Sequence, residues 1–183
     1  MPLLTTDMNL KGALQKANLI PEVINESFSP STLLQVTYPN DREVTLGNTL
    51  TTDETSQAPE IFFVPPEPEA SYTLVMTDPD APSTTDHQFG PWRHWIAVNI
   101  SGSNVAEIKE HHTPYIGPGP GPNTGLHRYL FLLYKQPSAN QNFQSMAHEN
   151  KQDRRCFDLT KFVSEHQLEL VAANFFLCAN SSN

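Results

Sequence analysis

Two short stretches of the chain hold most of the residue types that could form a polar ligand site. The first, residues 77–83 followed by 90–95, carries two aspartates, two tryptophans and a histidine among three prolines. The second, residues 117–122 followed by 125–129, alternates glycine with proline and ends in a histidine and a tyrosine. Carboxylates and imidazoles beside bulky aromatics are typical of a small-ligand site walled by apolar surface. We therefore take these two stretches as the candidate site.

In the first stretch, prolines fix the path of the chain around two carboxylates. Pro79 and Pro82 remove two amide donors and fix two φ angles, which predicts a rigid loop at a strand end. Asp78 would then project from that strand end into a site. The alternative is a turn in which the aspartate caps its own backbone and both carboxylates are solvated. The Trp92 and His94 cluster, which follows after a short loop, favours the site.

The glycine–proline alternation of the second stretch limits the number of backbone donors. Proline has no N–H, while glycine lets the backbone come close to a ligand. Only a few amides, such as that of Gly119, would then face inward, which suits one small anion. The alternative is a stiff surface loop or a proline-rich binding epitope. The lysine of a nucleotide-binding phosphate loop is missing from the sequence that follows. His127 stands directly before an apolar strand, where it could face the same anion.

The elements that must position these residues are mostly short strands. Apolar periodicity predicts a helix over residues 8–18 and another that Asp158 caps and that runs to about 166. Strands are expected at 34–38, 61–64, 72–76, 95–100, 129–134 and 170–178. Three of them, 72–76, 95–100 and 129–134, are apolar on both faces, as in central strands covered on both sides. Residues 137–152 fit either a loop or an exposed helix. This pattern predicts a mainly β sandwich with peripheral helices.

Length and composition exclude several classes of protein. With 183 residues we expect one domain, with an N-terminal helical segment over 1–25 and a β core over 26–178. Eleven basic against twenty acidic residues give a net charge of −9, which argues against nucleic acid and against a broad membrane-binding face. The absence of an apolar run of about 18 residues predicts no integral membrane association, and with no secretion signal the cytoplasm is the expected location. Cys156 and Cys178 are therefore expected to be free thiols.

The motifs resemble the two signature regions of the phosphatidylethanolamine-binding protein family, which includes the Raf kinase inhibitor proteins. The resemblance is carried by Asp78-Pro-Asp-Ala-Pro82, by Trp92-Arg-His94, and by Gly117-Pro-Gly-Pro-Gly121 through Gly125-Leu-His-Arg-Tyr129, and it spans roughly residues 22–178. Other segments of the sequence, at 47–50, 131–137 and 173–176, are more similar to the fungal branch of the family, whose best-known type is carboxypeptidase Y inhibitor.

This resemblance implies a large central β-sheet packed on a smaller one, with an anion pocket at one end. It implies that Asp78, His94, Gly119, His127 and Tyr129 bind the ligand, with Asp80, Pro82, Trp92, Arg93 and Pro118 in the walls. Cis peptides are expected at Ala81–Pro82 and Gly90–Pro91. The expected ligand is phosphate or a phosphoethanolamine-like anion, and the expected protein partner a serine carboxypeptidase or a kinase or Ras pathway protein. The sequence departs from the pattern of the family in three ways. Arg93 stands where animal members often have a histidine, and Pro91 stands where many relatives have an acidic residue. A C-terminal helix that covers the pocket in animal members is also not expected here.

A binding and regulatory protein without cofactor, metal or catalysis is the function we expect. His94 and His127 would hydrogen-bond the anion while Asp78 orients an imidazole, so binding should weaken as the pH rises through about 6–7. A hydrolase using the aspartates and histidines is the rival hypothesis, although metalloprotease spacing and a Gly-x-Ser-x-Gly elbow are both missing and nothing marks Ser83 as activated. An adaptor with a vestigial pocket is the third possibility.

Overall fold

Two β-sheets of unequal size form the structure. The computed structural model describes the backbone of residues 3–182 and the side chains of residues 9–182. The larger sheet has six strands in the order β3 (Asn48–Thr49), β9 (Glu169–Cys178), β8 (His127–Lys135), β5 (Ser71–Asp78), β6 (Trp92–Ser101) and β7 (Glu110–Thr113). The smaller sheet has the order β2 (Arg42–Glu43), β1 (Gln35–Tyr38) and β4 (Glu60–Phe62). The predicted mainly β fold, with one large and one small sheet, is confirmed.

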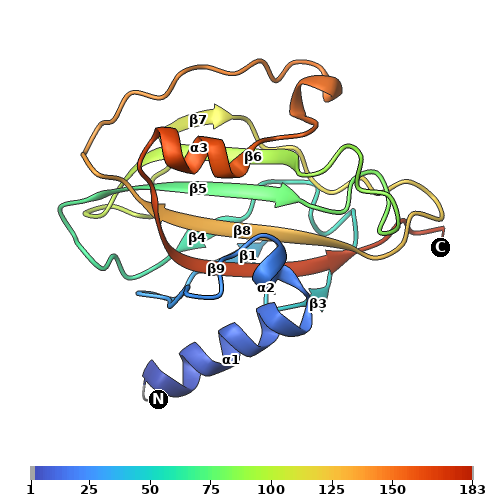
Figure 1. Ribbon diagram of the computed structural model, residues 1–183, viewed down its shortest axis with the longest axis horizontal. Helices are drawn as coiled ribbons and strands as arrows, with labels where there is room; N and C mark the ends of the chain where they lie inside the picture. Colours follow the sequence, from blue (N-terminus) through green and yellow to red (C-terminus); the bar gives the residue numbers. More distant parts are fainter. Residues whose placement is uncertain (1–2, 183) are drawn as a thin grey trace.

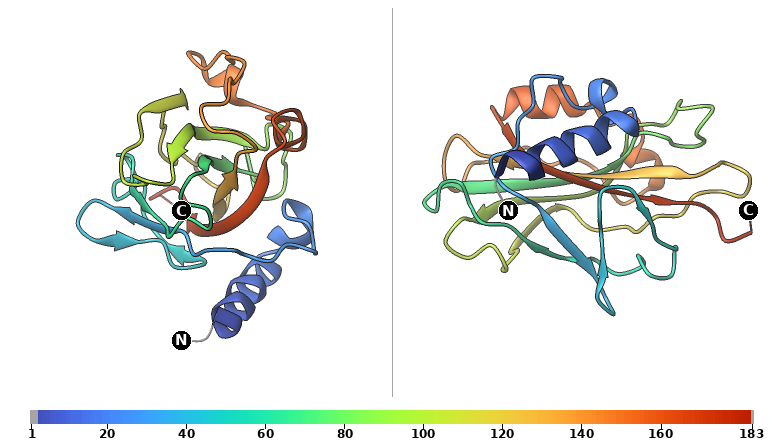
Figure 2. Two further views of the ribbon diagram at one scale, coloured as in Figure 1. Left: turned by 90° about the vertical axis from the view of Figure 1, so that its left-hand side faces the viewer. Right: turned by 90° about the horizontal axis from the view of Figure 1, so that it is seen from below.

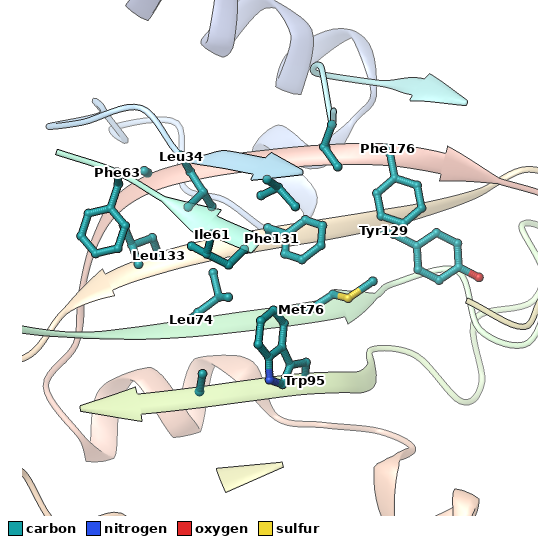
Figure 3. Packing of buried hydrophobic residues seen from close by; sticks show 14 of the residues in the cluster. Leu34, Ile61, Phe63, Leu74, Met76, Trp95, Tyr129, Phe131, Leu133 and Phe176 are labelled. Atoms are coloured by element: carbon teal, nitrogen blue, oxygen red, sulfur yellow. The ribbon is translucent and has the colours of Figure 1, made fainter. Parts of the chain in front are cut away.

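The large sheet has one face packed on the small sheet. On this face the core takes alternate residues of each strand, such as Leu74 and Met76 of β5 and Phe131 of β8, together with Leu34 and Ile61 from beside and within the small sheet. Figure 3 shows these side chains meeting between the two sheets. Because alternate side chains of a strand point to opposite faces, a two-faced apolar strand such as β5 needs a second cover on its other side.

Helices and a long loop supply that second cover. Val75, Ile96 and Leu132 lie on the face opposite the small sheet, in a separate core cluster. Their cover comprises α1 (Leu3–Lys16), α2 (Leu19–Glu22), α3 (Leu159–Glu165) and residues around the 3₁₀ helix η1 (Lys151–Arg154). In Figures 1 and 2 the helices lie on one side of the large sheet and the small sheet on the other.

The sequence predicted the elements that carry apolar residues and missed three short polar strands. The N-terminal helix, the six predicted strands and the helix that Asp158 caps are all present, and the Asp158 carboxylate accepts from the Lys161 amide at 2.9 Å. The strands β2, β3 and β7 were not predicted, because they are short and contain no apolar residue that could show an alternation. Residues 137–150 form an irregular loop, and no helix follows β9 within the described chain up to residue 182.

Strand register brings the two candidate stretches to one end of the large sheet. β5 ends where β6 begins, since Asp78 pairs with Trp92, and β8 begins where β9 ends, since His127 pairs with Cys178. The loops that follow β5 and precede β8 therefore meet at this end, at the right of Figure 1. The expected cis peptides at Ala81–Pro82 and Gly90–Pro91 are both present.

Candidate ligand-binding site

The two loops enclose a cavity of about 310 Å³ at this end of the sheet. All five predicted ligand residues line it, and they come from strands β5, β6 and β8 and from the glycine–proline loop. The full lining comprises Asp78, Ala81, Pro82, Phe89, Trp92, His94, Ile116, Gly117, Gly119, Pro120, Gly121, Thr124, His127, Tyr129, Lys151 and Arg155. Segments nearly eighty residues apart in the sequence thus build one site.

A β-bulge turns His94 toward the cavity. Met76 of β5 pairs with Trp95 and Thr77 pairs with Arg93, so His94 is the extra residue between these two pairs. Without the bulge, His94 would share a face with Ile96, which lies in the helix-covered core. A bulge inserts one residue and redirects the following side chains. Simple alternation along the strand would therefore have placed His94 on the wrong face.

His94 is a neutral ring in this environment. The side chain is 4% exposed, and burial lowers its pKa to about 4. Its Nδ1 lies 2.7 Å from the Ile116 carbonyl oxygen, so in the neutral ring Nδ1 carries the proton and donates to that carbonyl. The other nitrogen, Nε2, is then a hydrogen-bond acceptor. The expectation that His94 donates to an anion as an imidazolium near pH 6–7 does not fit this arrangement, because burial outweighs the attraction of Asp78.

A chain of hydrogen-bonding groups holds Asp78 against His127. The Thr124 hydroxyl donates to the Gly121 carbonyl at 2.7 Å. His127 Nε2 lies 2.9 Å from the same hydroxyl. His127 Nδ1 lies 2.8 Å from Asp78 Oδ2, so a hydrogen bond joins the ring to the carboxylate. The imidazole therefore covers one oxygen of Asp78, and both side chains are buried.

Tyr129 and Gly119 also line the cavity. Burial first, and the nearby Asp78 carboxylate second, raise the pKa of Tyr129, so its hydroxyl stays protonated. Figure 3 shows this hydroxyl at the edge of the core cluster, pointing away from the other rings. Gly119 is exposed and a Cβ atom built there would meet no other atom within 4 Å. Its backbone is therefore open to a ligand.

Two cations at the cavity were not predicted. Lys151 and Arg155 both line it, although they belong to the segment after the irregular loop. A signal for them existed: three of the eleven basic residues fall within positions 151–155 of an otherwise acidic chain. Because residues 137–152 fit either a loop or an exposed helix, the sequence did not predict that this segment reaches the site.

Of the predicted wall residues, Pro82 and Trp92 line the cavity, whereas Asp80, Arg93 and Pro118 do not. Both Asp80 oxygens accept from the Arg128 side chain, at 2.8 and 2.9 Å, which holds this carboxylate away from the cavity. Arg93 lies on the opposite face of β6 from Trp92 because successive strand residues alternate. Pro118 is buried, and it is the glycines on either side of it that line the cavity.

Metal sites and membrane spans were searched over the described chain. Among these residues, no three His, Cys, Asp or Glu side chains are grouped so that they could hold a metal ion. None of the helices in residues 3–182 is long and apolar enough to cross a bilayer. Cys156 and Cys178 are free, as expected, the first exposed and the second buried.

Comparisons with known proteins agree with this fold. The family model for phosphatidylethanolamine-binding protein matches residues 40–176. The chain is 33% identical to carboxypeptidase Y inhibitor of Saccharomyces cerevisiae, over 88% of this chain and 91% of that protein. The crystal structure of carboxypeptidase Y inhibitor complexed with the cognate proteinase aligns with a TM-score of 0.83 and 31% identity, over 96% of this chain and 97% of that one. A phosphatidylethanolamine-binding protein from Plasmodium vivax aligns with a TM-score of 0.76 over 93% and 97% of the two chains, and at 23% identity it supports the fold alone.

Proposed function

Because the chain belongs to the phosphatidylethanolamine-binding protein family, we propose that it binds a phosphate-like anion in the cavity and acts as a regulatory protein. The observation that carries this proposal is that the five expected ligand residues line one cavity together with two cations, Lys151 and Arg155. The anion's oxygens would accept from the Gly119 amide and the Tyr129 hydroxyl. Lys151 and Arg155 at the cavity would supply the attraction.

The neutral His94 ring narrows the class of ligand that we expect in the cavity. Since Nε2 is an acceptor, it suits a ligand that carries a proton, such as a phosphate monoester in its singly charged form or a phosphoethanolamine ammonium. A phosphate group gains that proton near pH 6. Binding should therefore weaken as the pH rises past about 6 because the ligand loses its proton, a different cause from the histidine titration that the sequence suggested.

Calorimetry with inorganic phosphate and with phosphoethanolamine tests anion binding. Tyr129→Phe removes one hydroxyl donor to a charged group and should weaken binding about tenfold. Tyr134→Phe is the matched control, because Tyr134 is a buried tyrosine of the same strand in the core cluster on the opposite face. Absence of binding to the unaltered protein, or equal affinity in both variants, would contradict the proposal.

We also propose that the chain inhibits a serine carboxypeptidase. The support is the 33% identity to carboxypeptidase Y inhibitor, and the fact that this relative's structure was solved in complex with its cognate proteinase. The contact surface that we expect comprises the N-terminal segment 1–20 and the rim of the cavity. Residues 1–2 and the side chains up to residue 8 lie outside the described part of the chain. No contact in the structure bears on a kinase or Ras pathway partner or on a cytoplasmic location, and both remain predictions.

A peptidase assay tests this second role. Micromolar protein added to carboxypeptidase Y should suppress cleavage of a peptide substrate, and a variant lacking residues 1–8 should lose this effect while it still binds phosphate. Full peptidase activity in the presence of the unaltered protein would exclude this role without affecting the anion proposal.

The rival hydrolase hypothesis has one geometric argument in its favour and one against it. Thr124, His127 and Asp78 stand in the order of a hydroxyl–imidazole–carboxylate triad. However, the Thr124 hydroxyl donates to the Gly121 carbonyl at 2.7 Å, which engages the hydrogen that a catalytic base would have to take. We therefore propose that the chain is not an enzyme. Ester or phosphoester turnover that Thr124→Val abolishes would overturn this.

A further inference from the structure

One arginine forms a wall common to the cavity and to a second hollow. Arg155 lines the cavity of about 310 Å³ and also an adjacent hollow of about 380 Å³. The second hollow is lined by Arg93, Met146, Ala147, Asp153, Arg155, Cys156, Phe157 and Asp158. A group bound in each hollow would therefore lie against the same residue.

The Arg155 guanidinium is held in place and has no carboxylate partner. It stacks on the Phe89 ring with 3.8 Å from its central carbon to the ring centroid. The amides of Cys156 and Phe157 donate to the carbonyls of Phe89 and Pro91, which fixes this segment against the loop after β5. Within residues 9–182 its side chain forms no hydrogen bond or ion pair, so its N–H groups are available. A stacked guanidinium is ordered before a ligand arrives, which lowers the entropy that binding costs.

A second cation, Arg93, lines the second hollow. Arg93 is 3% exposed, its Nη atoms donate to Met146 Sδ and to two carbonyl oxygens, and its Nε has no partner. None of the ion pairs among the described residues includes it. Burial and the nearby Arg154 lower the pKa of Arg93, whereas Asp153 acts in the opposite direction, so an anion bound against Arg93 would stabilise this guanidinium further.

Two carboxylates also line the second hollow, and both are engaged by backbone amides. Asp153 accepts from the Asn150 amide at 3.0 Å, and Asp158 accepts from the Lys161 amide at 2.9 Å. Arg154, which is 2% exposed, lines neither hollow and donates only to carbonyl oxygens. Three of the eleven basic residues, Arg93, Lys151 and Arg155, thus line the two hollows, in a chain whose net charge is −9.

We propose that the two hollows form one bipartite site for a small phosphomonoester that carries a second anionic group, with Arg155 between the two charges. The phosphate would lie in the first cavity and the second anion over Arg155 and Arg93. This inference rests on the proposed anion binding and adds the class of ligand. Lys151 lines the first cavity only, so it would contact the phosphate and not the second group.

A matched pair of ligands tests the bipartite site. Glycerol 3-phosphate and 3-phosphoglycerate share a three-carbon skeleton and differ in whether the far carbon is an alcohol or a carboxylate. Isothermal titration of the unaltered protein should show that 3-phosphoglycerate binds about tenfold more tightly, the usual effect of one charge-assisted hydrogen bond. Arg155→Gln should abolish this preference. Lys151→Gln, the control, should weaken both ligands and keep the ratio between them.

The outcomes separate the two proposals. If neither ligand binds, the proposed anion binding fails, and the bipartite site fails with it. If glycerol 3-phosphate binds but the two affinities agree within twofold, or if Arg155→Gln keeps the preference, anion binding stands and the bipartite site is wrong. Unfolding temperatures of the two variants, measured alongside, should agree with that of the unaltered protein, since both side chains lie at the surface.

Discussion

The chemistry of single residues in this site is set by burial and by how each proton is used. His94 is buried, donates from Nδ1 to the Ile116 carbonyl and stays neutral. His127 is also buried, but both of its nitrogens are engaged, one by Thr124 and the other by Asp78. Two histidines of one cavity therefore have different roles. One offers an acceptor to a ligand, while the other is hydrogen-bonded to the Asp78 carboxylate.

The low pKa of His94 predicts a loss of stability in mild acid. Its pKa is about 4 in the folded chain and ~6.5 when unfolded, so the unfolded chain takes up the proton first as the pH falls. The stability that the neutral ring contributes is complete above ~6.5 and is lost as the pH falls toward 4. Between pH 7.5 and 5 the free energy of unfolding should fall by about 2 kcal/mol more than in His94→Gln. Urea unfolding at both pH values measures this, and equal losses in the two proteins would contradict it.

At the scale of elements, two irregularities position the site. The bulge in β6 directs His94 to the cavity, as argued above. The glycine–proline loop, in turn, is pinned on one side by close backbone contact. A Cβ atom at Gly117 would overlap the Thr55 carbonyl oxygen, whereas one at Gly119 would meet nothing. The same loop therefore has one glycine that packing requires and another that leaves space beside the ligand.

This contrast predicts that two similar substitutions change the free energy of unfolding by very different amounts. Gly117→Ala should lower the free energy of unfolding by about 1–3 kcal/mol, the usual cost of overpacking a close contact. Gly119→Ala should change it by less than about 0.5 kcal/mol, as at an open surface position. Chemical denaturation of both variants tests this. A similar cost for the two alanines would show that the loop is not held against Thr55 as described.

At the scale of the whole molecule, one arginine ties the N-terminal helices to the loop that follows β5. Arg128 donates to both oxygens of Asp80, to the Ala17 carbonyl and to Glu22. Asp80 is 3% exposed, so its charge depends on this partner. The ion pair thus joins three segments far apart in the sequence, and it does so immediately beside the cavity.

Removing the ion pair between Arg128 and Asp80 should lower the free energy of unfolding more than removing an exposed ion pair does. Arg128→Met leaves Asp80 buried without its main partner and should lower the free energy of unfolding by roughly 3 kcal/mol. Adding Asp80→Asn should recover part of the loss. Arg42→Met, which breaks the exposed pair with Glu54, is the control and should cost no more than ~1 kcal/mol. Hydrogen exchange of residues 10–24 should increase in the first variant alone. Equal effects for Arg128 and Arg42 would contradict this account.

The sequence by itself determined the long elements, the loops and the family. Runs that are apolar on both faces, such as 72–76 and 129–134, specify buried central strands, since such runs cannot be left in water. Prolines and glycines in the two motif stretches mark where the chain must leave the sheet. These signals are local, so they can be read without knowing what packs against them. The short strands and the path of 137–150 carry no such signal.

Tertiary structure alone decided how the site residues are charged and which ones take part. Whether His94 is protonated depends on its burial and on a carbonyl 22 residues away, and Asp78 is hydrogen-bonded to a histidine 49 residues away. Lys151 and Arg155 reach the cavity because their segment is hydrogen-bonded to the loop after β5. Protonation and electrostatic partnership follow from distances in space. Those distances are fixed only when distant segments pack together.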